Sequence, residues 1–576
     1  MTRVLTMERA AAARRPASLL TDAAIFAAGL AALYGVMGIS RSWLSPARPV
    51  AEISLSPSAL PVYALYSLWR MGLAYLASLV FALVYAYAAA RNRVAERLLI
   101  PLLDILQSIP VLSFLPGVMM AMVSIFPDRE LGLELGSILL IFTGQVWNLA
   151  FSFYASLKGL PRELTEAATT YHFGHWQRFY QLELPYGAIG LVWNSMMSVA
   201  GGWFFLMACE MFQLGQRDFR LPGLGSYLQT AASAGDMRAI LWGLAAMIAV
   251  ILLLDQCLWR PLIAWAEKFK FEQVESAEAP QSAVLLALRH SASLAWVRRR
   301  ALAPAWEALT LRLARHEASE QPREGPVWRP YAARALGVAA LALVLYGAMR
   351  AGHILMGLTR DELSLLLHGA GATFARVMAA LAIGLVWTVP LGVAVGLRPR
   401  LASVVQPLAQ IAASVPATAL FPVLLLILFR AGGGMGLAAI LLMLLGTQWY
   451  LLFNVIAGAQ AVPSDLLEAA RVFRIRGWER WRLLILPGIF PYLVTGLVTA
   501  AGGAWNASIV AEYSRFQGRV LATTGLGATI SQATDAGNFD LLLASTVAMA
   551  VIVVTVNRVL WKRLFRLAQT RFRLET

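Results

Sequence analysis

Four charged residues lie inside long apolar stretches of this chain, where a charge is expensive to keep. Arg70 and Arg376 each follow a hydroxyl residue by three positions, and Glu210 and Glu512 lie in two later apolar stretches. An ionisable side chain in a bilayer is a candidate for function and normally has a partner. Because depth and charge match, we predict that Arg70 pairs with Glu210 and Arg376 with Glu512. Each pair could be purely structural, or it could act as a gate or contact an anion.

The composition identifies the surroundings of these charges as lipid. Of the 576 residues, 59% are hydrophobic and only 14% are charged, which excludes a soluble enzyme or a disordered scaffold as the default. Apolar windows of about 20 residues, the length of a membrane-spanning helix, recur along the chain. The net charge of +16 is an orientation signal, since Arg and Lys accumulate in cytoplasmic loops, and it does not indicate nucleic acid.

Hydropathy predicts an all-α polytopic membrane protein with about twelve transmembrane helices. The first follows a basic start and is read as a retained helix rather than a cleaved signal peptide. With the N-terminus in the cytoplasm, the basic loops all face inward, and the even number of spans places both termini there. The predicted spans are 20–40, 62–90, 98–126, 133–157, 186–212, 239–265, 331–351, 366–397, 402–430, 435–460, 488–512 and 541–562.

An internal repeat organises these helices. Pro101 and Pro110 match Pro407 and Pro416 at an offset of 306, and from Gly144 onward the offset is 302. The matches at 302 continue to the end of each half and include Trp147/Trp449, Pro161/Pro463, Glu166/Glu468, Pro185/Pro487, Glu210/Glu512, Gly223/Gly525 and Trp259/Trp561. Because each unit holds six spans, we expect two parallel six-helix repeats related by a pseudo-two-fold axis along the membrane normal.

The repeat sets the predicted domains. Residues 1–266 form a first transmembrane domain, 331–576 form a second, and 267–330 form a cytoplasmic linker. The linker contains a basic amphipathic stretch, a pattern typical of a helix on a lipid surface. It could simply connect the halves, or it could have a regulatory or partner-docking role.

A polar segment after the fourth helix of each half carries the functional signal. It reads Glu166-Ala167-Ala168 and later Gly174 in the first half, and Glu468-Ala469-Ala470 and later Gly477 in the second. A proline precedes each segment and another closes it, which predicts a short helix, a turn and a second short helix outside the membrane. We expect the glutamates near a helix terminus, where the helix dipole favours them.

These segments resemble the EAA loop of the inner-membrane permeases of binding-protein-dependent ATP-binding-cassette (ABC) importers. The resemblance covers nearly all of both halves and implies the type I importer permease fold with two permease domains fused. One departure is clear: the family's glycine usually lies six residues after the glutamate, where this chain has His172 and Arg474. We call residues 161–185 and 463–487 the EAA segments.

The resemblance implies partners. Two cytosolic ABC ATPase subunits would dock on the EAA segments, and a periplasmic or lipid-anchored binding protein would deliver substrate at a bacterial inner membrane. None of the chain's lysines follows a glycine, which excludes a GxxxxGK[ST] phosphate loop, so ATP and Mg would be bound by the partner subunits. We expect no catalytic residues, no cofactor and no nucleic acid partner for this chain. The expected ATPase-coupling residues are Glu166, Ala167, Ala168, Gly174, Glu468, Ala469, Ala470 and Gly477.

The stretch around Glu210, with the Gly-Leu-Gly that follows, resembles the nitrate, sulfonate, taurine and bicarbonate branch of these permeases and implies a small anionic substrate. The second half departs from this branch, with Tyr513 where Met is expected. Candidate residues for the translocation path are Ser108, Gln145, Asn194, Ser414, Thr418 and Asn506.

Two other classes of protein were weighed. A twelve-helix secondary transporter also uses two parallel halves, but it gives no reason for two EAA segments. A membrane enzyme would need clustered catalytic groups, and the spans show none. His172 and His175 have a spacing that suggests a metal, yet no third ligand is near, so no metal site is expected.

Overall fold

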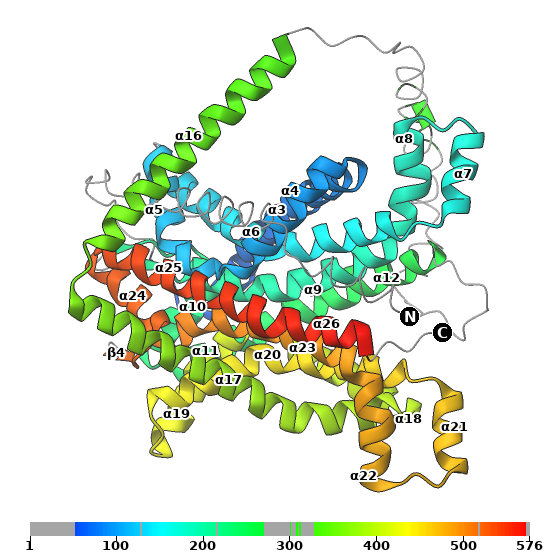
Figure 1. The fold of residues 1–576 in the computed structure, drawn as a ribbon. Coiled ribbons are helices and arrows are strands. Elements are labelled where there is room, and N and C mark those ends of the chain that lie inside the picture. The colour runs from blue at the N-terminus through cyan, green and yellow to red at the C-terminus, as the bar shows by residue number, and fades with distance from the viewer. Residues whose placement is uncertain are drawn as a thin grey trace.

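The computed structural model describes residues 52–126, 129–214, 217–269, 328–516 and 519–571, with the isolated positions 300, 304, 307, 308, 310 and 312. Nearly all of this backbone is helical, and its strands form two short antiparallel hairpins. The predicted all-α fold is confirmed (Figure 1). The predicted first span at 20–40 and most of the linker at 267–330 lie outside the described residues.

The described part of the first half begins with the short helical turn η1 and ends with another, η5. Its elements are η1 (Pro57–Ala59), α3 (Leu60–Arg91), α4 (Arg93–Ser108), η2 (Val111–Phe114), α5 (Leu115–Ile125), α6 (Arg129–Lys158), α7 (Arg162–Thr170), α8 (His175–Arg178), η3 (Phe179–Glu183), α9 (Leu184–Glu210), β1 (Gln213–Leu214), β2 (Arg217–Asp218), α10 (Leu224–Ala234), α11 (Met237–Leu254), η4 (Asp255–Trp259), α12 (Arg260–Ala266) and η5 (Glu267–Phe269).

The described part of the second half begins with α16 and then repeats this order. Its elements are α16 (Trp328–Met356), α17 (Arg360–Gly396), α18 (Pro399–Ser414), α19 (Ala417–Arg430), α20 (Met435–Gln460), α21 (Ser464–Val472), α22 (Gly477–Arg480), η7 (Trp481–Ile485), α23 (Leu486–Ala511), β3 (Tyr513–Phe516), β4 (Arg519–Ala522), α24 (Leu526–Ala536), α25 (Phe539–Val556), η8 (Asn557–Trp561) and α26 (Lys562–Arg571).

Eight helical stretches of the described part are long and apolar enough to cross a membrane, four in each half. They are Pro57–Arg91, Leu131–Lys158, His175–Glu210, Met237–Ala266, Arg360–Gly396, Met435–Gln460, Gly477–Ala511 and Phe539–Ala568. The span predicted at 331–351 falls within α16, which is helical but is not one of these eight.

The prediction of continuous helices at 98–126 and 402–430 is wrong. The first is divided into α4, η2 and α5, and the second into α18 and α19. Each break lies at a proline, Pro110 or Pro416, which cannot donate a backbone hydrogen bond and pushes the preceding residue into an extended conformation. Ile109 accordingly has ψ 123° and Val415 has ψ 117°. Hydropathy is high on both sides of each break, so it does not reveal the break.

The change of the repeat offset also has a structural cause. Helix α6 has 30 residues, whereas its counterpart α20 has 26, so the first half carries one additional helical turn. The repeat otherwise extends to unusual backbone detail. The rare π-helical turns η3 and η4 recur as η7 and η8 at the offset of 302.

The two halves run in the same direction, and the broken third helix of each half packs against the opposite half. In Figure 1, α7, α8, α21 and α22 project at the right, while α10 and α24 lie toward the left, so both EAA segments are at one end. The α4 to η2 segment of the first half packs against α25 and α23, and α18 and α19 of the second half pack against α9, α10 and α11. One large apolar core therefore includes residues of both halves.

Candidate coupling and translocation sites

The first buried ion pair joins α3 to α9. The Arg70 guanidinium donates from Nη1 to Glu210 Oε1 at 2.8 Å, and the side chains are 2% and 0% exposed. The same nitrogen also donates to the Pro222 carbonyl at 2.7 Å, just before α10 begins. The pair predicted from charge and depth is therefore present, and its arginine also binds the loop that leads into α10.

Glu210 also holds the N-terminus of α10. Its Oε2 accepts a hydrogen bond from the Gly225 backbone N–H at 2.7 Å, and Oε1 accepts one from Ser67 Oγ at 2.7 Å. The carboxylate satisfies a helix N-terminus, the positive end of the helix dipole. A Cβ at Gly223 would lie 2.3 Å from the Glu210 carboxyl carbon, so the glycine is required for this approach.

The second half repeats this arrangement. Arg376 Nη1 donates to Glu512 Oε1 at 2.8 Å, and Glu512 Oε2 accepts from the Gly527 backbone N–H at 2.9 Å. Thr373 Oγ1 donates to Glu512 at 2.8 Å and accepts from the Leu526 N–H at 2.9 Å. The spaced motifs in the sequence thus belong to one structural unit: an Arg–Glu pair that fixes a short outer helix.

The two units differ in the further partners of the arginine. Arg70 also binds Glu134 of α6, with Nε and Nη2 each 2.6 Å from a carboxylate oxygen. The residue equivalent to Glu134 at the offset of 302 is Gly436. Arg376 instead donates from Nη2 to Thr523 Oγ1 at 2.9 Å. Arg70 is therefore paired with two carboxylates and Arg376 with one.

Both EAA segments fold as expected, with a short helix, a turn and a second short helix. The turn places His172 and Arg474 in the left-handed region, each with φ 53°. The following residue closes the helix: the Phe173 N–H donates to the Ala168 carbonyl, and the Ile475 N–H to the Ala470 carbonyl, both at 2.9 Å. This is the Schellman end normally made with glycine, so the conformation is kept where the glycine is missing.

The structure corrects the expected position of the EAA glutamates. Glu166 and Glu468 lie in the middle of α7 and α21 rather than at a terminus, and both are exposed. The acidic residues of the first turns are Glu163 and Asp465. The other expected coupling residues divide by burial: Ala168 and Ala470 are buried, Ala167 and Gly477 are exposed, and Gly174 and Ala469 are partly exposed.

The base of each EAA segment is held in a different way. In the first half, Glu183 accepts from Arg91 Nη2 at 2.6 Å and from Arg178 Nε at 3.0 Å, with its own side chain 4% exposed. The positions equivalent to Glu183 and Arg91 are Ile485 and Leu397, which lie in one apolar cluster. An ion pair in one half thus corresponds to an apolar contact in the other.

The structure places the described candidate path residues in contacts within one half rather than at a cavity. Gln145 is fully buried, with Nε2 3.0 Å from Met71 Sδ, and Asn194 donates from Nδ2 to Ser152 Oγ at 3.1 Å. These are contacts between helices of one half. Thr418 is buried at the start of α19, and Asn506 donates to the Gly502 carbonyl of its own helix.

The side chains of Ser108 and Ser414 lie outside the described part of the structure. None of the other four candidates lines the cavity described next.

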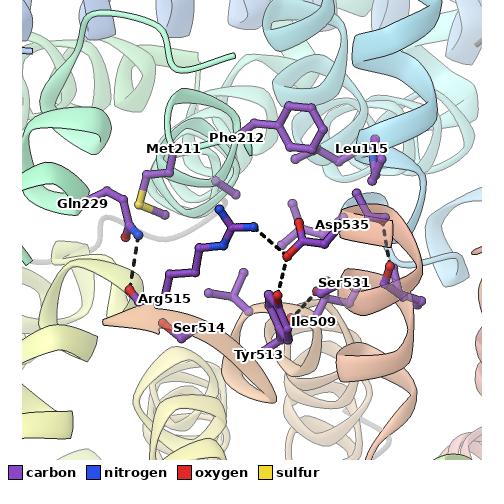
Figure 2. Close-up of a pocket in the computed structure, with 16 residues that line it drawn as sticks. Leu115, Met211, Phe212, Gln229, Ile509, Tyr513, Ser514, Arg515, Ser531 and Asp535 are labelled. Atoms are coloured by element: carbon purple, nitrogen blue, oxygen red, sulfur yellow. Dashed lines mark hydrogen bonds and ion pairs between the residues drawn. The ribbon is translucent and has the colours of Figure 1, made fainter. Parts of the chain in front are cut away.

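A cavity of about 170 Å³ lies between the halves, at the end opposite the EAA segments (Figure 2). Equivalent positions of the repeat line it together, as Ala208/Val510, Met211/Tyr513, Phe212/Ser514 and Gln229/Ser531. A cavity lined by equivalent residues of both halves must lie on the pseudo-two-fold axis, and we call it the axial cavity. The remaining lining residues are Leu112, Leu115, Pro116, Ile509, Arg515, Ile530, Thr534 and Asp535.

The polar groups of the axial cavity come mainly from the second half. Arg515 Nη2 lies 2.7 Å from Asp535 Oδ2, and the Tyr513 hydroxyl donates to the same oxygen. Burial and the hydrogen bond to Asp535 raise the pKa of Tyr513 to about 12, so the phenol stays protonated as a donor. Across the cavity, Gln229 Nε2 donates to the Arg515 carbonyl at 3.4 Å and joins the halves.

Sequence reasoning missed these cavity residues, although a signal was present. At the offset of 302, Arg515 and Asp535 replace Gln213 and Ser233, so one half gains two charges in its outer segment. Tyr513, which stands where the family branch has Met, lies in the same outer segment. No group of three metal-ligating side chains occurs among the described residues, and His172 and His175 lie on the first EAA segment.

The fold and these sites define a class: a helical membrane transport protein of two parallel halves around an axis. The chain belongs to the family of binding-protein-dependent transport system inner membrane components, whose sequence model matches it twice, at residues 74–257 and 388–573. This confirms the family resemblance and the duplicated organisation.

Curated relatives fall in the branch expected from sequence. The taurine transport system permease protein TauC of Escherichia coli (strain K12) is 29% identical over 181 residues, 31% of this chain and 62% of its own length. The bicarbonate transport system permease protein CmpB of Synechococcus elongatus is 30% identical over 24% of this chain and 49% of its own. The nitrate import permease protein NrtB of Leptolyngbya laminosa is 25% identical over 32% and 63%. The chain thus spans from 49% to 63% of the length of these relatives.

Proposed function

We propose that this protein is the transmembrane permease of an ATP-driven importer for a small anion. The two halves would form the translocation path, and two separate ATPase subunits would bind the EAA segments. The observation that carries this proposal is the EAA segment itself. It occurs twice, has the same fold and the same left-handed turn, and projects twice from one end of the molecule.

The surfaces of the EAA segments suit docking of a partner protein. Tyr171 of the first segment is 75% exposed, and Phe473 and Trp478 of the second are 77% and 71% exposed. Large exposed apolar side chains beside charged ones are typical of interaction sites. Both segments are anchored at their bases by Glu183 or Ile485, so a displacement of the segment would move α9 or α23.

The family and the named relatives support a binding-protein partner and separate ATPase subunits. A binding protein would deliver the substrate at the end that holds the axial cavity, and the basic loops at the EAA end would face the cytoplasm of a bacterium, with both chain termini. The transmembrane domains would be 1–266 and 331–576, joined by the linker 267–330. The chain itself would bind no cofactor and catalyse no reaction, with ATP and Mg held by the ATPase subunits.

The test is purification from native membranes in mild detergent, followed by mass spectrometry of the associated proteins. We expect an ATPase with a phosphate loop at two copies per chain. Its absence even after gentle cross-linking would overturn the proposal in favour of a twelve-helix secondary transporter.

A second test uses Glu166→Gln together with Glu468→Gln, with Glu163→Gln and Asp465→Asn as the matched control in the same helices. ATP-dependent uptake should fall in the first double variant and persist in the second. Unchanged uptake in the first would remove these glutamates from the coupling role.

A further inference from the structure

The charges that face the axial cavity cancel. Arg515 and Asp535 are the charged residues that line it, and they lie 2.7 Å apart, with side chains 31% and 20% exposed. Figure 2 shows both side chains reaching into the space between the halves. A plain anion that approaches Arg515 meets the Asp535 carboxylate beside it and must either accept repulsion or displace it. Each alternative lowers its affinity.

A ligand with both charges avoids this cost. Its acidic group would bind the Arg515 guanidinium while its ammonium group binds Asp535, so the original ion pair is replaced by two new ones. The Tyr513 hydroxyl, which already donates to Asp535, would hold that carboxylate in place. A site whose charged groups each need a partner discriminates strongly against a ligand that lacks one of them.

The size and the walls of the cavity fit a small ligand of this kind. Its volume of about 170 Å³ corresponds to the liquid volume of roughly six water molecules at ~30 Å³ each. The first half supplies an apolar wall that includes Leu115 and Phe212, opposite the charged groups of the second half. A short hydrocarbon chain between two charged ends would match this arrangement.

We infer that the axial cavity is a substrate site for a small zwitterion, an acid that also carries an ammonium group, with Arg515 binding the acidic group and Asp535 the ammonium. This inference rests on the proposed import function and narrows its substrate class from small anions to aminosulfonates and similar molecules. Only the second half provides these two charged groups, because the first half has Gln213 and Ser233 at the equivalent positions.

The experiment is equilibrium binding to the purified full-length chain in lipid nanodiscs, without ATP or ATPase. The probes are 2-aminoethanesulfonate, ethanesulfonate, which lacks the amine, and ethylammonium, which lacks the acid. We expect 2-aminoethanesulfonate to bind roughly tenfold tighter than either. Asp535→Asn should bind ethanesulfonate more tightly than the wild type and lose the preference, and Arg515→Gln should lose both sulfonates.

The matched control is Asp255→Asn, which removes a second Arg–Asp pair, Arg260–Asp255 at 3.0 Å, outside the cavity. It should leave all three affinities unchanged. A wild-type chain that binds ethanesulfonate as tightly as 2-aminoethanesulfonate, or binds no probe saturably, would overturn the inference. So would an Asp535→Asn variant that keeps the preference.

A labelling experiment covers the case in which the charge variants fail to fold. Ser514→Cys, in a chain whose native cysteines are replaced, places a thiol on the cavity wall without changing its charges. 2-Aminoethanesulfonate should slow maleimide labelling and ethanesulfonate should not; equal protection would contradict the inference. Binding without any co-purifying ATPase would defeat only the proposed function, whereas ATP-driven uptake without this preference would defeat only the inference.

Discussion

Gly525 is the residue at which the second buried ion pair is most sensitive to added volume. A Cβ there would lie 2.0 Å from Glu512 Oε2, and real contacts never come so close. Gly525→Ala should displace the carboxylate from Arg376 and from the α24 N-terminus. We expect a loss of about 3 kcal/mol in the free energy of unfolding. Thermal unfolding in detergent measures it.

The control for this substitution is Gly502→Ala in α23, where an added Cβ meets nothing within 4 Å. Ala is favoured over Gly in a helix interior, so this variant should be neutral or more stable by up to about 1 kcal/mol. If both variants lowered the melting temperature equally, close packing of Gly525 against Glu512 would not be the cause.

Arg474 adopts the left-handed conformation that glycine adopts without strain. Its φ of 53° closes the first helix of the second EAA segment. Arg474→Gly should therefore stabilise the chain by about 1 kcal/mol, and His172→Gly should act in the same direction in the first half. Val472→Gly, two residues earlier in the last turn of α21, should instead destabilise by a similar amount. Equal destabilisation by Arg474→Gly and Val472→Gly in a melting experiment would show that this turn holds no strain.

At the scale of elements, the sequence predicted the EAA helices and failed on the third helix of each half. Prolines at the ends of the EAA segments are placed where helices begin, so both segments were predictable from local rules. Pro110 lies inside an apolar stretch with no drop in hydropathy, and the prediction continued a helix through it. The break depends on the residue before the proline and on packing against the opposite half, and neither enters a hydropathy window.

The two EAA segments are anchored differently, so the apolar anchor of the second half can be tested as a replacement for the ion pair of the first. Glu183→Ala should destabilise the first half by about 2 kcal/mol, because Arg91 and Arg178 lose their buried partner while both remain partly hydrated. The double variant Arg91→Leu with Glu183→Ile copies the second half, where Leu397 and Ile485 belong to one apolar cluster. It should recover most of the lost stability, since a buried ion pair can be replaced by apolar residues of similar volume.

Chemical denaturation of the single and double variants measures the coupling between these two positions. The same Glu183→Ala variant should also reduce ATP-driven uptake, because the segment is no longer fixed to α3. A double variant that is no more stable than Glu183→Ala would mean that the apolar contact of the second half cannot be transferred to the first.

At the scale of the whole molecule, the repeat in the sequence predicted the parallel halves but not the site between them. The repeat was recognised from residues that are identical in the two halves, such as Glu210 and Glu512. The charged groups of the axial cavity lie at positions where the two halves differ. Arg515 of β3 and Asp535 of α24 are unremarkable in the sequence until the fold places these two outer elements on the pseudo-two-fold axis. Contacts between halves, such as Gln229 with the Arg515 carbonyl, join positions nearly 300 residues apart that no local pattern connects.

The position of the axial cavity makes relative motion of the halves testable. Ala208 and Val510 are equivalent residues of α9 and α23 that both line it. In a chain without its native cysteines, Ala208→Cys with Val510→Cys should be linked by a short cleavable bifunctional thiol reagent. If transport requires the halves to move apart, linkage should lower ATP-driven uptake roughly tenfold, and reduction should restore it.

The control link lies within one half. A Cβ at Gly190 of α9 would be 2.9 Å from Ser152 Oγ of α6, so Gly190→Cys with Ser152→Cys joins two helices that should move together. This link should leave uptake unchanged, because a rigid half loses no motion when its own helices are tied. Equal inhibition by both links would mean that the halves deform internally during transport, and unimpaired uptake with the axial link would mean that the cavity does not open along the axis.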